Sequence, residues 1–155
     1  MIDYFKSAKS TLLIVILMLF SGWLFTYQTI TENAFTLYTA YIFLNNILII
    51  ILIIEHLDDN KIYSLIDSLI LALNNILMFA FLYNEYGITN SDKLLIKHDY
   101  MISLYFSIIT WTTLGYGDFT PTENTRIFAS IEALLGYIYT AIIIGLLINY
   151  LQRKK

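Results

Sequence analysis

The chain of 155 residues has no cysteine, one proline and two histidines, and only 14% of its residues are charged. The absence of cysteine excludes disulfides, thiol nucleophiles and cysteine-containing zinc sites. The formal charge of -3, with no basic stripe interleaved with aromatic residues, gives no indication of a nucleic-acid partner. Because no nucleophile-base pair or metal-ligand group is apparent, we expect neither an enzyme nor a bound cofactor.

Hydrophobic residues, by contrast, make up 58% of the chain, and the mean hydropathy is +0.67. This composition predicts that lipid surrounds most of the protein. A helix needs about 20 mostly apolar residues to cross the hydrocarbon of a membrane. Four stretches meet that requirement, namely residues 10–31, 33–54, 62–84 and 127–152. The first is longer than the apolar region of a signal peptide and lacks an obvious cleavage site, so we interpret it as a retained anchor.

A fifth uncharged stretch, residues 100–117, divides into two parts. Its first part, to about residue 110, would form a helix of roughly 15–17 Å, about half the thickness of the hydrocarbon. Residues 112–117 contain two threonines and two glycines, which favours an extended return to the same side of the membrane. Lipid offers no partners for unpaired backbone groups, so this return must face a pore or other protein.

The distribution of basic residues favours four membrane crossings over five. With four crossings, one side of the membrane receives Lys6, Lys9, Lys61, Arg153, Lys154 and Lys155, and the other receives Lys93, Lys97 and Arg126. This satisfies the positive-inside rule, whereas five crossings would separate the two basic ends of the chain. We therefore predict a multi-pass protein of the cell membrane with both termini in the cytoplasm.

The segment "SLYFSIITWTTLGYGDFTP" at residues 103–121 resembles the pore helix and selectivity filter of potassium channels. The resemblance extends over about residues 99–151. It implies an all-α membrane protein with four transmembrane helices, a re-entrant pore helix and an extended filter. Residues 1–98 would form a three-helix region whose third helix is the outer helix of the pore module, and residues 99–155 would form the rest of the pore.

The resemblance also implies that the chain is a subunit of a channel that conducts K⁺ passively, with K⁺ as the permeant ion. Backbone carbonyls replace water around the ion without a formal charge that would trap it. By resemblance, the ion sites come from the carbonyls of Thr113, Leu114, Gly115 and Tyr116, with the Thr113 hydroxyl as the innermost ligand. Glycine reaches positive φ without a steric penalty, which is the freedom that Gly115 and Gly117 supply.

Neighbouring residues would support this filter. The resemblance implies that Tyr116 points away from the pore axis and packs on Tyr105 and Phe106 of the pore helix, with Thr112 and Asp118 at the two ends of the filter. Phe106 stands where many relatives have a tryptophan whose N–H holds the acid, which leaves the partner of Asp118 open. The alternative for Asp118 is an exposed turn residue.

The last helix, "FASIEALLGYIYTAIIIGLLINYL", resembles the pore-lining helix of small bacterial channels. Gly136 matches the hinge of that family if one residue is missing from the loop after Pro121. It can serve as a hinge or allow close helix packing, while Gly145 marks a level at which the pore could close. Glu132 is an acid inside a spanning helix and must face protein or water. A hydrogen bond behind the pore helix, to a threonine or tyrosine, is favoured over direct ion coordination.

One copy of the filter motif provides a quarter of an ion-binding cage, so a homotetramer in the lipid membrane is implied. Residues 10–84 contain no basic residue except Lys61 in a loop, and we therefore expect weak or absent voltage sensing. The first two helices would act as a collar responsive to lipid or a partner, or as extra packing. Two other functions stay open: a weakly selective cation channel, because Leu114 replaces a valine or isoleucine, and a non-conducting membrane adaptor.

Overall fold

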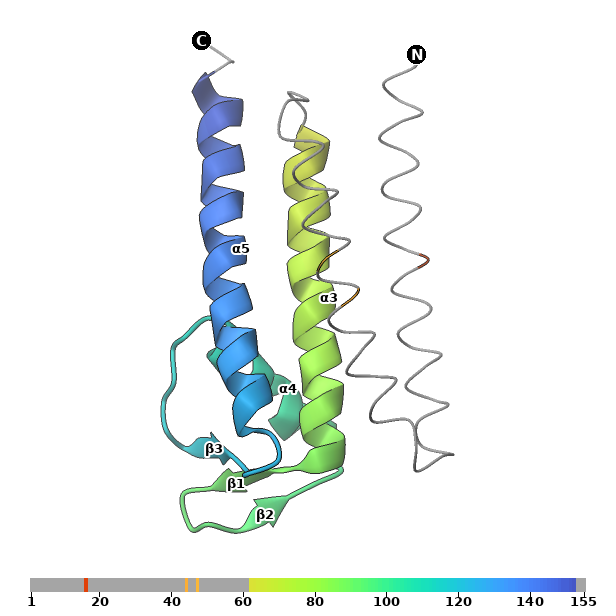
Figure 1. Cartoon of the computed structure of the whole chain (residues 1–155), viewed down its shortest axis with the longest axis vertical. Helices are drawn as coiled ribbons and strands as arrows, with labels where there is room; N and C mark the ends of the chain where they lie inside the picture. The colour runs from red at the N-terminus through yellow and green to blue at the C-terminus, as the bar shows by residue number, and fades with distance from the viewer. Residues whose placement is uncertain (1–15, 17–43, 45–46, 48–61, 153–155) are drawn as a thin grey trace. The chain divides into compact units, whose positions relative to one another are not determined.

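The structure is a computed structural model that describes Ile16, Leu44, Ile47 and residues 62–152 (Figure 1). Apart from those three positions, each of which is helical, the helices predicted at residues 10–31 and 33–54 lie outside the described residues. The described elements, in chain order, are α3 (Ile62–Tyr86), β1 (Ile88–Asn90), β2 (Leu95–Ile96), α4 (Tyr100–Trp111), β3 (Phe119–Pro121) and α5 (Arg126–Gln152).

The chain divides into two compact units, one of residues 1–71 and 143–155 and the other of residues 72–142. In the first unit, the described parts are the beginning of α3, where Ser68 and Leu71 are buried, and the end of α5, where Leu146 is buried. The second unit contains the rest of both helices together with α4 and all three strands. It therefore contains the whole segment that the sequence marks as functional.

The two long helices agree with the sequence-based prediction to within two residues at each end. Both contain a stretch long and apolar enough to cross a membrane, Leu65–Tyr86 in α3 and Arg126–Gln152 in α5. Helix α3 ends at Gly87, whose φ is 85° and whose N–H donates to the Tyr83 carbonyl at 2.8 Å. A side chain at this position would lie 2.7 Å from Leu95 Cδ1, so the turn into β1 requires glycine.

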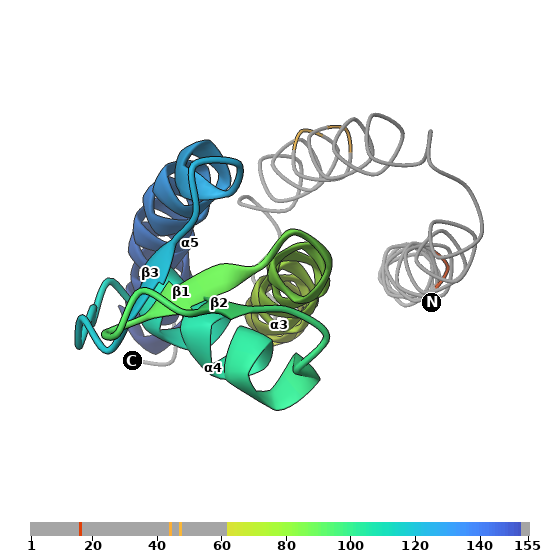
Figure 2. The same ribbon diagram turned by 90° about the horizontal axis from the view of Figure 1, so that it is seen from below.

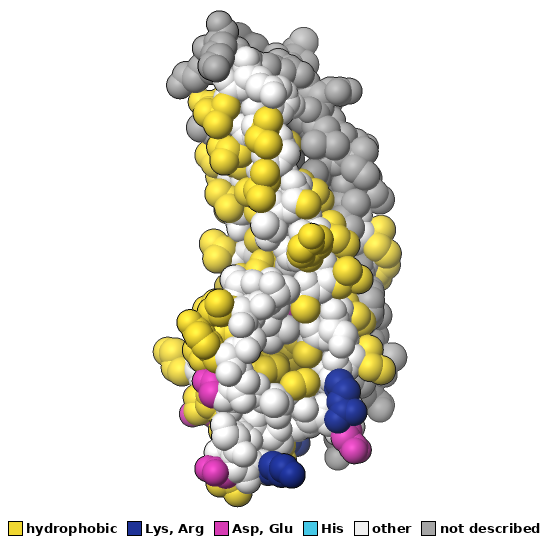
Figure 3. Space-filling model, turned by 90° about the vertical axis from the view of Figure 1, so that its left-hand side faces the viewer, with side chains coloured by type: hydrophobic (Ala, Val, Ile, Leu, Met, Phe, Trp, Pro, Cys, Tyr) yellow, Lys and Arg dark blue, Asp and Glu magenta, His cyan; other side chains and the backbone are white. Residues whose placement is uncertain are grey.

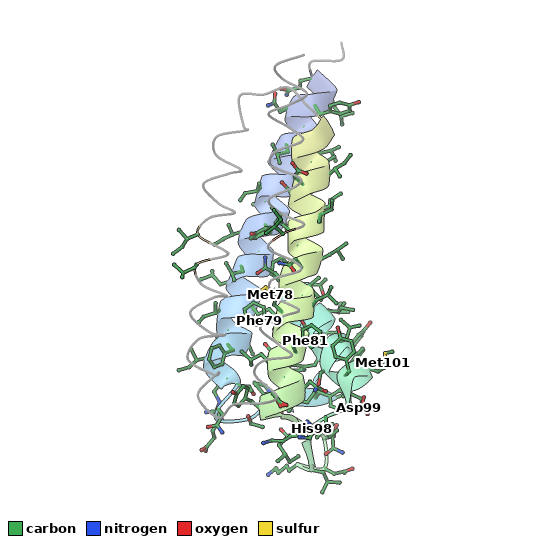
Figure 4. All side chains as sticks on the ribbon, turned by 90° about the vertical axis from the view of Figure 1, so that its right-hand side faces the viewer. Met78, Phe79, Phe81, His98, Asp99 and Met101 are labelled. Carbon is green, nitrogen blue, oxygen red and sulfur yellow. The ribbon has the colours of Figure 1, made fainter. Side chains whose placement is uncertain are left out.

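Helix α4 is short because a capping residue begins it and a change of backbone conformation follows it. Asp99 has an extended backbone, and its carboxylate accepts from the Ile102 N–H at 3.1 Å, as an N-cap does. The helix has 12 residues, a length of about 18 Å, which confirms the prediction of a helix too short to span. Figure 4 shows Asp99 at the beginning of α4, with Met101 projecting away from α3.

Aromatic side chains pack between the three helices in the unit of residues 72–142. Tyr83 of α3 is fully buried and meets Phe106 of α4 edge to face, with ring centroids 4.8 Å apart. Trp111 at the end of α4 packs on the fully buried Tyr139 of α5 at 5.4 Å. Burial gains little transfer energy when the alternative solvent is lipid, so close packing and hydrogen bonds must hold these helices together.

A small antiparallel sheet, which the all-α prediction did not include, lies at the end of the unit where α3 finishes (Figures 1 and 2). Its order is β2-β1-β3, with β1 in the centre. Thr89 of β1 pairs with Leu95 on one side and with Thr120 on the other. The sheet thereby joins the loop after α3 to the segment that precedes α5. On the face drawn in Figure 3, charged side chains gather at this end.

Replacement of Asp99 tests the cap that begins α4. We expect Asp99→Ala to lower the free energy of unfolding by about 1 kcal/mol, because the Ile102 N–H loses its acceptor. Asp99→Ser is the matched control, since its hydroxyl can accept the same bond and should retain most of the stability. Thermal or denaturant unfolding in detergent measures both variants. Equal losses in the two variants would show that the cap is not what the carboxylate contributes.

Candidate functional site

The segment that follows α4 has a backbone that alternates in handedness. Positive φ occurs at Thr113 (55°), Gly115 (51°) and Gly117 (81°), and at neither Leu114 nor Tyr116. Alternation of this kind turns successive peptide planes the same way, so that the N–H groups face one side and the carbonyl oxygens the other. In an ordinary strand the carbonyls would instead point to opposite sides in turn.

Residue types explain why the chain adopts this conformation here. Positive φ costs a non-glycine residue roughly 1–2 kcal/mol, and two of the three positions are glycine. Nothing lies within 4 Å of a Cβ placed on Gly115 or Gly117, so backbone conformation rather than crowding demands glycine there. Thr113 is the exception, and its conformation is held by the last turn of α4, where its N–H donates to the Thr110 carbonyl at 3.0 Å.

The end of α4 also holds the next residue and the helix cap. The Leu114 N–H donates to the Ile109 carbonyl at 2.9 Å, and the Thr112 hydroxyl donates to the Ile108 carbonyl at 2.8 Å. The Ile109 carbonyl is one that the helix end would otherwise leave without a partner, whereas the Ile108 carbonyl also accepts from the Thr112 N–H at 3.0 Å. Thr112, predicted as a support of the segment, therefore has a direct structural contact with the helix before it.

Every residue from 112 to 117 is exposed in the single chain. Leu114 is 56% exposed and Tyr116 is 67% exposed, although both are large and apolar. Phe106 is buried and meets Tyr83, and the predicted packing of Tyr116 on Tyr105 and Phe106 stays a prediction. An exposed segment of this composition, directly after the buried Trp111, has the character of a surface that other protein covers.

Asp118, at the outer end of the segment, is held from three directions. The Tyr105 hydroxyl donates to its Oδ2 at 2.8 Å, the Phe119 N–H donates to its Oδ1 at 3.1 Å, and the Ser91 hydroxyl donates to its carbonyl at 3.2 Å. The sequence left the partner of this acid open, because Phe106 has no donor, and the structure identifies Tyr105, one position earlier in α4, as the side chain that donates to it. Asp118 is thus a bonded residue and not a free acid of an exposed turn.

The sheet extends this support into the loop before α4. The Thr89 hydroxyl of β1 lies 2.8 Å from the Thr120 hydroxyl of β3, and the backbones of these residues are paired. Ser91 follows in the same hairpin and reaches Asp118. Sequence analysis missed Thr89 and Ser91, because strands of three residues separated by about 30 positions leave no periodic pattern to detect.

Glu132 lies behind α4 and joins three helices. It is fully buried in α5, its Oε2 accepts from the Tyr83 hydroxyl of α3 at 2.6 Å, and its Oε1 lies 2.5 Å from the Ser107 hydroxyl of α4. Ser107 also lies 2.8 Å from the Ile76 carbonyl of α3. The predicted hydrogen bond behind the short helix is therefore present, with tyrosine and serine as the partners. None of the hydrogen bonds of Glu132 involves residues 113–117.

Gly136 of α5 touches the backbone at the end of α4. A Cβ on Gly136 would overlap the Trp111 carbonyl oxygen and lie 2.9 Å from the carbonyl carbon. The close approach that small residues allow between membrane helices therefore accounts for this glycine. Gly145 differs, because no described residue lies within 4 Å of a Cβ placed there. The gating roles proposed for Gly136, Gly145 and Glu132 stay predictions.

Protein side chains offer no alternative cation site in the part of the chain that the structure describes. No group of three histidine, aspartate or glutamate residues there could hold a metal ion. Any ion bound by residues 112–117 would have to be coordinated by backbone carbonyls and threonine hydroxyls.

Comparison with known proteins agrees with this geometry. The model of a family described as "Ion channel" matches residues 69–153, more than half of the chain. "Two-pore potassium channel 5" of Arabidopsis thaliana is 41% identical over 54 residues, which cover 34% of this chain and 13% of that protein. "Two-pore potassium channel 2" of the same plant is 30% identical over 104 residues, 63% of this chain and 23% of that protein.

A bacterial relative matches over a shorter stretch with a higher identity. "Protein LctB" of Geobacillus stearothermophilus is 52% identical over 42 residues, 27% of this chain and 31% of that protein. The chain spans less than a third of the length of each of these three relatives. No solved structure matches it.

Alanine substitution at the two glycines of α5 tests the backbone contact. We expect Gly136→Ala to destabilise the protein by roughly 1–3 kcal/mol, because the new methyl group overlaps the Trp111 carbonyl. The matched control is Gly145→Ala, which meets no neighbour within the chain and should be neutral or stabilising by up to about 1 kcal/mol. Thermal unfolding in detergent compares them, and a loss at Gly145 equal to that at Gly136 would contradict the assigned contact.

Alkaline titration tests the bond between Tyr105 and Asp118. This hydrogen bond, followed by partial burial and the negative charge of Asp118, raises the pKa of the Tyr105 phenol above the ordinary value of 10.0. The bond therefore stabilises the fold fully below the pKa of the unfolded chain and is lost as the pH rises through the higher pKa of the folded state. The difference in phenolate absorbance between the native protein and Tyr105→Phe should develop only above pH 10.0.

Asp118→Asn is the control for this titration, because it keeps an acceptor but removes the charge. In that background the Tyr105 phenol should titrate at lower pH than in the native protein. If Tyr105 ionises at the same pH in both backgrounds, Asp118 does not act on it.

Proposed function

The chain belongs to the ion channel family, and on that premise we propose that it is one subunit of a potassium-selective channel, which conducts K⁺ passively across a membrane. The potassium channels among its relatives support the choice of ion. Two helices long and apolar enough to cross a membrane suit a membrane protein of this family. Because the chain spans only part of its relatives, the pore module is the part that the proposal concerns.

The observation that carries the proposal is the alternating backbone of residues 113–117. Carbonyl oxygens that share one side of a segment can surround an ion in place of its water. We assign the ion sites to the carbonyls of Thr113, Leu114, Gly115 and Tyr116, with the Thr113 hydroxyl as the innermost ligand and Gly117 ending the filter. These oxygens carry no formal charge, so K⁺ can leave as readily as it enters.

Helix α4 adds a favourable field at the inner end of this segment. The last carbonyls of a helix carry a partial negative charge of about half an electron. Trp111 and Thr112, at the C-terminus of α4, come directly before Thr113. A cation at the innermost site would therefore be favoured, and the effect would be repeated in each subunit.

Four copies of the chain are needed to complete the cage. One chain has a single filter segment, and all six residues from 112 to 117 are exposed. In a homotetramer with a fourfold axis these segments would face one another, and Leu114 and Tyr116 would lose their exposure to neighbouring subunits. Helix α5, whose Leu134, Tyr137 and Leu151 are more than half exposed, would then contact lipid, pore or partner subunits.

The topology of the whole protein is also part of the proposal. We propose four crossings with both termini in the cytoplasm of the cell, no voltage sensing, and a division into residues 1–98 and 99–155. The first two crossings fall outside the described residues. On this arrangement α4 and the filter enter from the outer side, where the sheet and the charged residues of its connecting loops would lie.

Flux measurements on purified protein in liposomes test the function. We expect K⁺ flux that Ba²⁺ blocks and a reversal potential near the potassium equilibrium value under a K⁺/Na⁺ gradient. Gly115→Ala should reduce the flux about tenfold or more, since each subunit must force alanine into positive φ at about 1–2 kcal/mol. Ser130→Ala, at an exposed position of α5, is the reconstitution control.

The same measurement decides between the alternatives. A reversal potential between the K⁺ and Na⁺ values would indicate a weakly selective cation channel. Leu114→Val would then be the first substitution to test for restored selectivity. Tetramers that fold but pass no ions would indicate a non-conducting adaptor. Protein that remains monomeric in membranes would reject the proposed pore altogether.

A further inference from the structure

Four oxygen-bearing groups form a continuous chain behind α4. The Tyr83 hydroxyl lies 2.6 Å from Glu132 Oε2, Glu132 Oε1 lies 2.5 Å from Ser107 Oγ, and Ser107 Oγ lies 2.8 Å from the Ile76 carbonyl oxygen. All three distances are those of hydrogen bonds between oxygens. Glu132 and Ser107 are fully buried, so bulk water does not take part.

Counting hydrogens shows that this chain needs a third proton. Three O···O contacts require three hydrogens, and the two hydroxyls of Tyr83 and Ser107 supply only two. The Ile76 carbonyl is an acceptor only, so it must receive the hydrogen of Ser107. The short contact between Ser107 and Glu132 then needs its hydrogen from the carboxyl group.

Electrostatics also indicates that Glu132 keeps its proton and is uncharged. An ionised carboxylate in a spanning helix would need a cation or several donors to offset its desolvation. The ionisable group that faces Glu132 from α3 is the neutral phenol of Tyr83, and α4 presents only the Ser107 hydroxyl. No lysine, arginine or histidine among the described residues forms an ion pair with it, and the partner of His98 is Glu85.

We propose that Glu132 is a neutral carboxylic acid that donates to Ser107, which in turn donates to the Ile76 carbonyl, while Tyr83 donates to the acid. The acid then acts as a positioning residue. It connects α5 to α4 and α3 through a relay of three consecutive hydrogen bonds. Each group donates to the next, from the Tyr83 hydroxyl to the Ile76 carbonyl of α3. This inference rests on the proposed function, because Glu132 positions α4, the helix that directly precedes the proposed filter.

Glutamine is the conservative replacement that this relay tolerates. Its amide oxygen can accept from Tyr83 and its amide N–H can donate to Ser107, as the protonated acid does. We therefore expect Glu132→Gln to fold and conduct like the native protein. Glu132→Ala should be much less stable, because it leaves the Tyr83 and Ser107 hydroxyls buried without this partner.

The pH dependence of stability separates a neutral acid from an ionised one. A neutral buried acid must lose its proton on unfolding, so the folded state holds one more proton than the unfolded state. The unfolding equilibrium constant of the native protein, relative to Glu132→Gln, should then rise about tenfold per pH unit over roughly pH 5 to 8. An ionised Glu132 gives no pH dependence of this ratio in that range, which would overturn the proposal.

Infrared spectroscopy provides a second readout that requires no unfolding. The difference spectrum of native protein minus Glu132→Gln at neutral pH should contain the C=O band of a protonated carboxyl, shifted by exchange into D₂O and perturbed by Ser107→Ala. A carboxylate band in its place would contradict the neutral acid. Both measurements are independent of ion flux, so a protonated Glu132 in a protein that conducts nothing would reject the proposed function and leave this inference standing.

Discussion

On the proposed topology α4 stops partway through the hydrocarbon, and a helix that does so must be supported by protein, a requirement that bears on the whole unit of residues 72–142. Lipid cannot pair the backbone that follows α4, and 12 residues cannot reach the far side. Each part of α4 accordingly has its own contact. Asp99 caps its beginning, Ser107 bonds its middle to two neighbouring helices, and the Trp111 backbone at its end lies against Gly136. The segment of alternating φ starts from an end that is already fixed.

Hydrogen bonds to Asp118 fix the other end of that segment. Asp118 is bonded by Tyr105 from α4 and by Ser91 from the hairpin, and β3 continues directly into the sheet. Residues 113–117 therefore run between two anchored points. Their conformation depends on these end contacts and on the glycines, because all five side chains are exposed in the single chain. Within one chain, the conformation of residues 113–117 is thus determined by contacts at the two ends of the segment and not by contacts of its side chains.

The sequence predicted the long helices well because length and hydropathy determine them, and it predicted the short helix because an uncharged stretch ends in Thr-Thr and glycine. The sheet was missed, since its strands of two or three residues show no alternation and their partners are remote in the chain. The partner of Asp118 was left open, because Phe106 carries no hydrogen-bond donor. The donor is Tyr105, one position earlier, and one position rotates a helical side chain by about 100°.

The candidate site was less predictable than the fold. The buried acid in α5 could be recognised from its cost in lipid, and a tyrosine was anticipated among its partners, but Tyr83 and Ser107 could not be named without the crossing geometry of three helices. The contact of Gly136 has a further consequence for sequence variation. Because it meets the main chain of Trp111, it constrains residue 136 to hydrogen as a side chain while placing no demand on the identity of residue 111. At this junction the constraint on residue 111 comes only from the packing of its indole on Tyr139, whereas the constraint on residue 136 comes from the main chain itself.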